Sequence, residues 1–198
     1  MSTTTTTARI TVDEFENSDL YDDNRVELID GEVIRKDEMK PAPVLAVELV
    51  KQGVGPMLPA RRFIRQDGPV RIPNFNEPLP DITVAHGDPR TYADHHPGPE
   101  DISLVIEVSD TTLAKDRGPK WEAYGRADIP VYWIVNLVDR QVEVYTLPAP
   151  HGYRARQNYR PGETLDVVID GTVVGSIAVD DILPGARPEQ PRPEGNGA

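Results

Sequence analysis

Cysteine is absent from the 198 residues, and so is any long apolar run. The first absence excludes disulfide bonds and metal sites built on thiolates. No apolar stretch approaches the roughly 18 residues needed to cross a bilayer. The threonine-rich start, residues 1–8, has neither the basic beginning nor the apolar centre of a signal peptide. We therefore expect a soluble, cytoplasmic protein with no membrane partner.

Positive charge is also scarce: 21 Lys and Arg residues stand against 33 Asp and Glu residues, a net charge of −12. This balance counts against a nucleic-acid partner, because such proteins usually carry a basic surface. A nucleic-acid backbone interacts with local charges rather than with the net charge, however, and two basic sets could flank a cleft. They are Arg61, Arg62, Arg65 and Arg71, and Lys115, Arg117, Lys120 and Arg126.

Length and composition are typical of one globular domain between two tails. Prolines and glycines crowd the last fifteen residues, which cannot bury enough apolar area to fold. The predicted organisation is a disordered tail at 1–8, a domain at 9–183 and a second disordered tail at 184–198.

Helix and strand signals alternate between these tails. A capping box formed by Thr11 and Glu14 begins the first expected helix. Helices are predicted over 12–20, 43–57 and 116–127. Strands are predicted over 61–66, 70–72, 79–85, 103–109, 131–136, 141–147, 153–156, 165–170 and 172–179. This order predicts an α/β fold in which helices flank a mixed sheet.

A hairpin is expected between the first and second helices. The pair Asp30-Gly31 lies between alternating apolar residues and suits a two-residue turn, which needs positive φ at both positions. With this turn, Glu27 lies opposite Ile34. The same signal recurs at 170–171.

Two carboxylates lie in strongly apolar strands. Glu107 interrupts the run 104–108, where an ionised group is costly to bury unless it is paired or binds a metal. Asp81 begins a second apolar strand. Side chains from neighbouring strands could converge on a hard divalent cation. The alternative is an aspartate in water at a strand end and a glutamate paired with an arginine.

A lysine follows on the next predicted helix. Asp116, Lys120 and Tyr124 are spaced at i, i+4 and i+8 and line one helical face. Asp116 is expected to cap this helix, with Pro119 in its first turn. A positive charge near a metal-bound phosphate stabilises the developing charge and orients the attacking water. The alternative is a solvated surface lysine.

These motifs together resemble a known family. They are Pro80-Asp81, Leu-Val-Ile-Glu107-Val-Ser109, Asp116-x-x-x-Lys120-x-x-x-Tyr124, the segment 129–135 and the opening 26–32. The combination resembles the Uma family of predicted restriction endonucleases, a branch of the PD-(D/E)XK nucleases. The similarity covers roughly residues 9–184 and is strongest over 79–147.

The resemblance implies a restriction-endonuclease-like fold with an extra N-terminal hairpin and C-terminal strands. It implies a metal-dependent endonuclease that hydrolyses phosphodiester bonds of nucleic acid, with DNA favoured. Asp81 and Glu107 would bind Mg²⁺ or Mn²⁺, and the Val108 carbonyl would be a further ligand. Lys120 would assist the nucleophile, and Glu27 would be an auxiliary acid.

One departure from the parent pattern concerns the lysine. The parent superfamily has it two residues after the second acid, where this chain has Ser109. Lys120 would then be a relocated lysine that reaches the site from the helix.

Other functions stay open at this level. The acidic charge favours a catalytically silent nuclease fold used as an interaction module. A homodimer is also left open. A histidine metal site would use His86, Asp88, Asp94, His95 and His96, but these lie in a Gly- and Pro-containing loop and match no zinc motif. A serine hydrolase is disfavoured because no Gly-x-Ser-x-Gly element exists.

Overall fold

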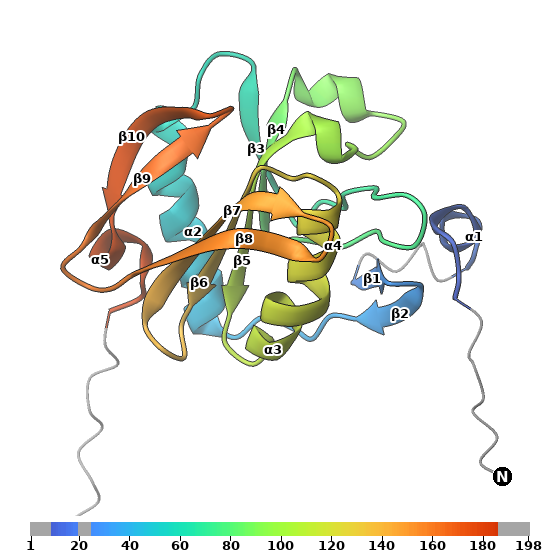
Figure 1. The fold of residues 1–198 in the computed structure, drawn as a ribbon, viewed down its shortest axis with the longest axis horizontal. Helices are drawn as coiled ribbons and strands as arrows, with labels where there is room; N and C mark the ends of the chain where they lie inside the picture. Colours follow the sequence, from blue (N-terminus) through green and yellow to red (C-terminus); the bar gives the residue numbers. More distant parts are fainter. Residues whose placement is uncertain (1–8, 20–24, 186–198) are drawn as a thin grey trace, which may run out of the picture.

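A six-stranded mixed sheet forms the centre of the computed structural model, which describes residues 9–19 and 25–185 (Figure 1). The strand order is β3-β4-β5-β6-β7-β8. Its strands are β3 (Arg62–Gln66), β4 (Ile82–His86), β5 (Ile102–Ser109), β6 (Val131–Asn136), β7 (Gln141–Ala149) and β8 (Gly152–Tyr159). β5 and β6 pair in parallel, and the other neighbours pair antiparallel. The predicted mixed sheet is confirmed.

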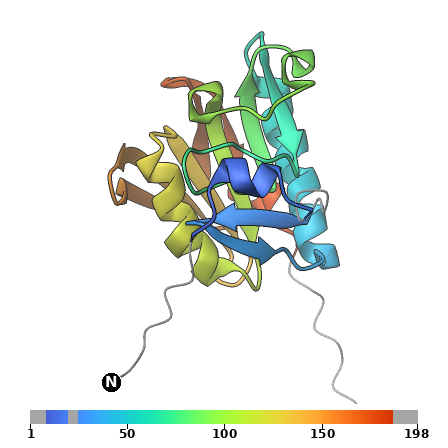
Figure 2. The same cartoon turned by 90° about the vertical axis from the view of Figure 1, so that its right-hand side faces the viewer.

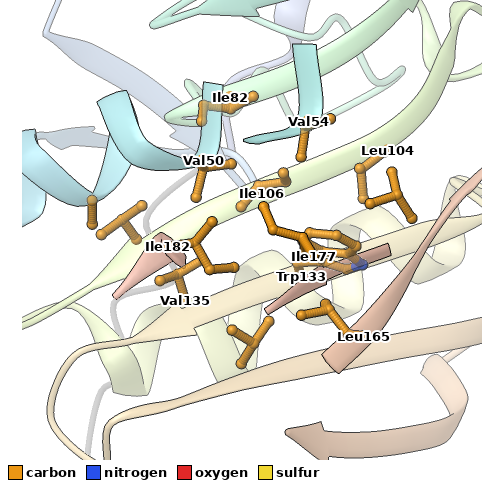
Figure 3. Close-up of a cluster of buried hydrophobic side chains, with 14 of the residues drawn as sticks. Val50, Val54, Ile82, Leu104, Ile106, Trp133, Val135, Leu165, Ile177 and Ile182 are labelled. Atoms are coloured by element: carbon orange, nitrogen blue, oxygen red, sulfur yellow. The ribbon is translucent and has the colours of Figure 1, made fainter. Parts of the chain in front are cut away.

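Two layers cover the sheet. On one face lie α2 (Pro41–Val54), α5 (Val179–Ile182) and the hairpin of β9 (Thr164–Ile169) and β10 (Thr172–Ala178). Figure 3 shows Val50 and Val54 of α2 beside Ile106 and Trp133 of the sheet. The crossover from β5 to β6 covers the other face and consists of α3 (Leu113–Lys115), the π-helical turn η4 (Asp116–Lys120) and α4 (Trp121–Arg126). β5 is buried along its whole length, which explains its nearly continuous apolar sequence.

The N-terminal elements lie across one side of the sheet, between α2 and the α3–α4 segment (Figure 2). They are α1 (Val12–Glu16), β1 (Val26–Ile29) and β2 (Glu32–Arg35). The capping box of α1 and the hairpin register, with Glu27 opposite Ile34, are both confirmed. The helix ends at Glu16 rather than at residue 20, which lies outside the described residues. Short 3₁₀ turns complete the fold: η1 (Gly55–Met57), η2 (Pro89–Tyr92) and η3 (Pro99–Asp101).

The expected start of the third helix is wrong. The helix begins at Leu113, so Pro119 lies inside it rather than in its first turn. An internal proline has no N–H to donate, and its ring crowds the carbonyl four residues earlier. The wider π-helical turn around Pro119 accommodates both effects. Lys120 consequently still points inward.

The structure also bears on the predicted strand at 70–72 and on the predicted tails. Residues 70–72 form no named strand, and Ile72 makes only an isolated bridge with Asn76. The predicted tails lie outside the described residues, except for Pro184 and Gly185. Within the described part of the chain, no helix combines the length and apolarity needed to cross a membrane.

Gly125 sets how closely α4 approaches β8. A Cβ at this position would lie 2.1 Å from the carbonyl oxygen of Gly152, a backbone atom that cannot swing away. We expect Gly125→Ala to lower the free energy of unfolding by about 2–3 kcal/mol, because overpacking outweighs the gain in helix propensity. Urea denaturation measures this change.

Gly118→Ala is the matched control, because a Cβ there meets nothing within 4 Å. It should leave the free energy of unfolding within about 1 kcal/mol of wild type, because the gain in helix propensity is offset by the restricted backbone of a residue that precedes a proline, here Pro119. Equal effects of the two substitutions would contradict the close approach of α4 to β8.

Candidate active site

A pocket of about 350 Å³ opens where the ends of β4 and β5 meet the N-terminal hairpin and the α3–η4 segment. Every residue that the sequence predicts for the site lines this pocket: Glu27, Asp81, Glu107, Val108 and Lys120. Segments nearly 100 residues apart in the chain thus bring their charged side chains together. The predicted constellation is assembled in space, while the roles of its members stay predictions.

Lys120 is buried against two carboxylates. Its Nζ lies 2.8 Å from Glu107 Oε1 and 3.0 Å from Glu27 Oε2. Tyr124, one turn further along the helix, donates its hydroxyl to the same Glu107 oxygen at 2.8 Å. Lys120 is 2% exposed, so the solvated-lysine alternative is wrong. Glu107 pairs with this lysine rather than with an arginine.

Asp81 is held from both sides at the start of β4. Its Oδ2 accepts the Val108 backbone N–H at 2.7 Å, and its Oδ1 accepts Lys36 Nζ at 2.9 Å. The same ammonium donates to the Leu79 carbonyl at 2.8 Å. Asp81 is 4% exposed, which excludes the alternative of a solvated aspartate at a strand end.

Glu27 comes from the hairpin and is fully buried. Its two oxygens accept from Lys115 at 3.1 Å, from Lys120 at 3.0 Å and from the Leu79 N–H at 3.2 Å. The carboxylate therefore holds two lysines of the helical segment in place. This geometry suits an auxiliary, positioning acid.

The environments of the two buried glutamates shift their pKa values in opposite directions. Burial raises the pKa of Glu107 to about 8; Lys120 opposes this, and the negative charges of Asp81 and Asp116 add to it. Burial also acts to raise the pKa of Glu27, but Lys120 and Lys115 outweigh it, so the pKa of Glu27 lies below its usual value. Pairs of acids separated in this way are common at sites that transfer protons.

Ser109, which stands in the usual lysine position, has a different partner. Its hydroxyl donates to Asp116 Oδ2 at 2.6 Å, and Thr112 donates to the same oxygen at 2.7 Å. Asp116 therefore joins the end of β5 to the start of the helical segment instead of capping the helix. This connection sets the position from which Lys120 reaches Glu107.

Lys36 was missed by the sequence reasoning. Ile34 shares a hairpin face with Glu27, and Lys36 follows two residues later, which continues the same alternation. The hairpin register therefore contained a signal for this lysine. Burial acts to lower the pKa of Lys36, but Asp81 and Glu107 together raise it above its usual value, so the side chain stays positively charged.

The oxygens of the pocket suit a hard divalent cation. Glu107 Oε2 accepts no hydrogen bond from any residue that the structure describes. The Val108 N–H points at Asp81, and the carbonyl of a residue in an extended strand points to the same side as its N–H. Asp81 Oδ1 becomes available when Lys36 moves away. Mg²⁺ commonly takes one or two carboxylates and keeps several waters.

The net charge of the pocket lining also suits a divalent cation. Of the residues that the structure describes, seven acidic and five basic ones line the pocket, so this lining carries two negative charges when every group is ionised. Within residues 9–19 and 25–185, no three His, Asp or Glu side chains form a ready-made metal cluster. A cation here would therefore rest on Asp81, Glu107 and the Val108 carbonyl.

The first basic set of the sequence does not flank this pocket. Arg62 pairs with Asp170, Arg71 pairs with Glu16, and neither lines the pocket. Of the second set, Lys115 and Lys120 do line it. The expected cleft between two basic segments is wrong, because ion pairs across the fold engage the first set elsewhere.

The rival sites of the sequence form no catalytic arrangement. His86, Ser103 and Asp170 do meet, but His86 Nε2 lies 2.9 Å from Ser103 Oγ and 3.2 Å from Asp170 Oδ1. A Ser-His-Asp triad needs the acid on the other ring nitrogen. In the predicted histidine loop, His95 contacts Asp94 and His96 contacts Arg65.

Comparisons with known proteins agree with this fold. The crystal structure of an Anabaena variabilis protein, titled a "putative nuclease belonging to DUF820", superposes with a TM-score of 0.55 at 15% identity. The match covers 79% of this chain and 88% of that one, which shows a shared fold. A search of curated proteins found no match. The model of the family Uma2, described as "Putative restriction endonuclease", matches residues 12–174. The chain therefore belongs to the Uma2 family.

Proposed function

We propose that this protein is a metal-dependent endonuclease that hydrolyses phosphodiester bonds of nucleic acid, with DNA as the favoured substrate. The observation that carries the proposal is the meeting of Asp81, Glu107 and Lys120 at the ends of β4 and β5, inside one pocket. Family membership supports the same reaction class.

The proposed metal ligands are Asp81, Glu107 and the Val108 carbonyl, with Mg²⁺ or Mn²⁺ as the ion. A divalent ion at this position supplies Lewis acidity and lowers the pKa of a bound water. The end of β5 and the helix α4 hold both carboxylates in place before substrate arrives, because the Val108 N–H donates to Asp81 and the Tyr124 hydroxyl donates to Glu107.

In this proposal, lysine side chains stabilise the negative charge of the substrate phosphate. Lys120 presents a buried ammonium beside Glu107, where it stabilises negative charge that develops on a phosphate in the pocket. Glu27 keeps that ammonium in place and also holds Lys115 at the wall of the pocket. Lys36, which contacts Asp81 Oδ1 at 2.9 Å, would give up this carboxylate to a cation and would then add a second positive charge for the substrate.

The Lys36–Asp81 contact also favours a second candidate, a catalytically silent nuclease fold. An ammonium on Asp81 Oδ1 satisfies that carboxylate without a cation. In this alternative the pocket binds a partner and carries out no hydrolysis. A homodimer stays a prediction in both cases.

Cleavage assays test the endonuclease. Plasmid DNA, linear duplex, single strands and RNA are incubated with the full chain in Mg²⁺, Mn²⁺ or chelator. We expect cleavage that requires the metal and falls at least about a hundredfold in Asp81→Asn, because the substitution removes a charged ligand. Calorimetry should show weakened Mn²⁺ binding in the same variant.

Asp37→Asn is the matched control, because Asp37 lines the same pocket but is exposed. It removes one negative charge and should cleave at nearly the wild-type rate. Metal-independent cleavage that is equal in all three proteins would refute the proposal. Confirmed Mn²⁺ binding without turnover on any substrate would establish the silent module instead.

A further inference from the structure

Among the residues that the structure describes, five arginines gather where the helical segment lies beside β7 and β8, outside the active-site pocket. They line two adjoining hollows of about 700 and 400 Å³, and Arg117 and Arg156 line both. The arginine surface consists of Arg117, Arg140, Arg154, Arg156 and Arg160. Asp139 is the one acid among the described residues that line the two hollows. In a chain of net charge −12, this is a strong local concentration of positive charge.

A buried acid beneath the surface fixes two of these arginines. Glu143 is fully buried and accepts from Arg117 at 3.1 Å and from Arg156 at 3.0 Å. Burial acts to raise its pKa, but hydrogen bonds, with Arg117 first, lower the pKa of Glu143 to about 2. Arg156 also stacks over the Tyr145 ring at 5.5 Å. These contacts orient both guanidinium groups before a ligand arrives.

Two other arginines of the arginine surface do not contact Glu143. Arg154 and Arg160 are exposed, and their side chains form no hydrogen bond or ion pair with any residue that the structure describes. Exposed and unpaired guanidinium groups are free to bind phosphate oxygens with two parallel N–H donors. Among the described residues, the surface thus combines two arginines fixed by Glu143, two that are unpaired, and Arg140, which donates to the Pro184 carbonyl at 3.1 Å.

The same helical segment separates the arginine surface from the active-site pocket. Lys120 lines the pocket, whereas Arg117 and Trp121, at i and i+4 of that segment, line the hollows. A helix with its side chains is about 10–12 Å across. Phosphates of one nucleic-acid strand recur about every 3.4 Å along the axis. A strand with one phosphate in the pocket would therefore reach the arginines within a few nucleotides.

We propose that the arginine surface binds the phosphodiester backbone of the nucleic acid, on the flank next to the bond to be cleaved. This inference rests on the proposed function. Arg154 and Arg156 are two residues apart on β8, and Arg160 follows four residues after Arg156, just past the end of the strand. The intervals are about 7 and 13 Å, or about two and four phosphate steps along a duplex axis. Both intervals are close to multiples of one phosphate step, which favours a polymer of evenly spaced charges over an irregular acidic protein. The surface also explains how a chain of such negative charge holds an anionic substrate.

Binding assays with the full chain in chelator separate this inference from catalysis. The anisotropy of a labelled single strand and of its duplex is measured over a salt series for wild type and Arg154→Glu/Arg160→Glu. We expect the variant to bind about tenfold more weakly or worse, with a slope of log affinity against log salt that is about two units smaller. Urea denaturation should give wild-type stability, because neither side chain has a partner to lose.

Arg61→Glu/Arg90→Glu is the matched control. Both side chains are exposed, and the charge change is the same, but neither lines the hollows. It should keep affinity within about twofold of wild type if only local charge matters. Equal weakening by both double variants, or no weakening by the first, would overturn the inference. So would equally tight binding of a labelled poly-aspartate peptide.

The two proposals fail in different ways. Selective loss of binding in Arg154→Glu/Arg160→Glu, combined with no hydrolysis by wild type, keeps the binding surface and rejects the endonuclease. Metal-dependent hydrolysis with unchanged nucleic-acid binding in that variant keeps the endonuclease and rejects the arginine surface.

Discussion

Lys120→Met should abolish nucleic-acid hydrolysis and lower the free energy of unfolding by about 3–5 kcal/mol near pH 8. Methionine keeps most of the side-chain length but removes the ammonium that pairs with Glu107 and Glu27. Both carboxylates are then buried with less compensation, and loss of one partner of a buried pair has a cost of this size. Cleavage assays and urea denaturation measure the two effects.

The stability loss in Lys120→Met should shrink as the pH falls from 8 to 5. Without Lys120, the folded protein keeps a proton on the buried Glu107, whose pKa burial already raises, whereas the unfolded chain releases this proton above about pH 4.5. A carboxyl whose pKa is raised in the folded state lowers the free energy of unfolding as the pH rises above its unfolded pKa. The variant is therefore least stable at high pH. Mn²⁺ binding should persist in the variant, because the proposed ligands remain.

Lys115→Met is the control for Lys120→Met. Lys115 pairs with the same Glu27, but its side chain is a quarter exposed. Its loss should lower the free energy of unfolding by about 1 kcal/mol and leave most of the hydrolysis. Wild-type stability of Lys120→Met, or a hydrolysis rate within tenfold of wild type, would count against its role.

Mn²⁺ affinity should rise about tenfold per pH unit between about pH 6 and pH 8 and level off above this range. Burial raises the pKa of Glu107 to about 8, so below that pH the carboxyl carries a proton that the metal must displace. Metal binding should therefore release close to one proton near neutral pH. Calorimetry in two buffers of different ionisation enthalpy measures both the affinity and the proton release.

Glu107→Gln removes the titrating group and keeps the shape of the side chain. Its Mn²⁺ affinity should be weaker and nearly constant between about pH 6 and pH 8. A flat wild-type profile, or the same slope in the variant, would show that Glu107 does not bind the metal.

Much of the site was accessible to reasoning from local sequence. Glu107 and Asp81 are conspicuous because a charge inside an apolar strand needs a partner, and the structure supplies partners for both. The Asp30-Gly31 turn determined which hairpin residues face each other, since a two-residue turn leaves one register. The inward position of Lys120 follows from helical spacing with Tyr124.

Other features depend on segments far apart in the chain. The Lys36–Asp81 contact joins residues 45 positions apart, and the arginine surface combines the helical segment with β7 and β8. The helix also starts at Leu113 rather than after Asp116. The Asp116 carboxylate, which was expected to cap the helix, instead accepts hydrogen bonds from Ser109 and Thr112. Local propensity has no information about such competition for hydrogen-bond partners.

The sequence by itself determined most of the strands, the hairpin register and which acids and which lysine are buried, because each follows from periodicity, turn geometry or the cost of burying a charge. Only the tertiary structure decided which lysine neutralises which acid and which arginines face the same hollow. Pairing of charges is a matter of distance in space, and residues such as Lys36 and Asp81 become neighbours only after the sheet and hairpin have packed together.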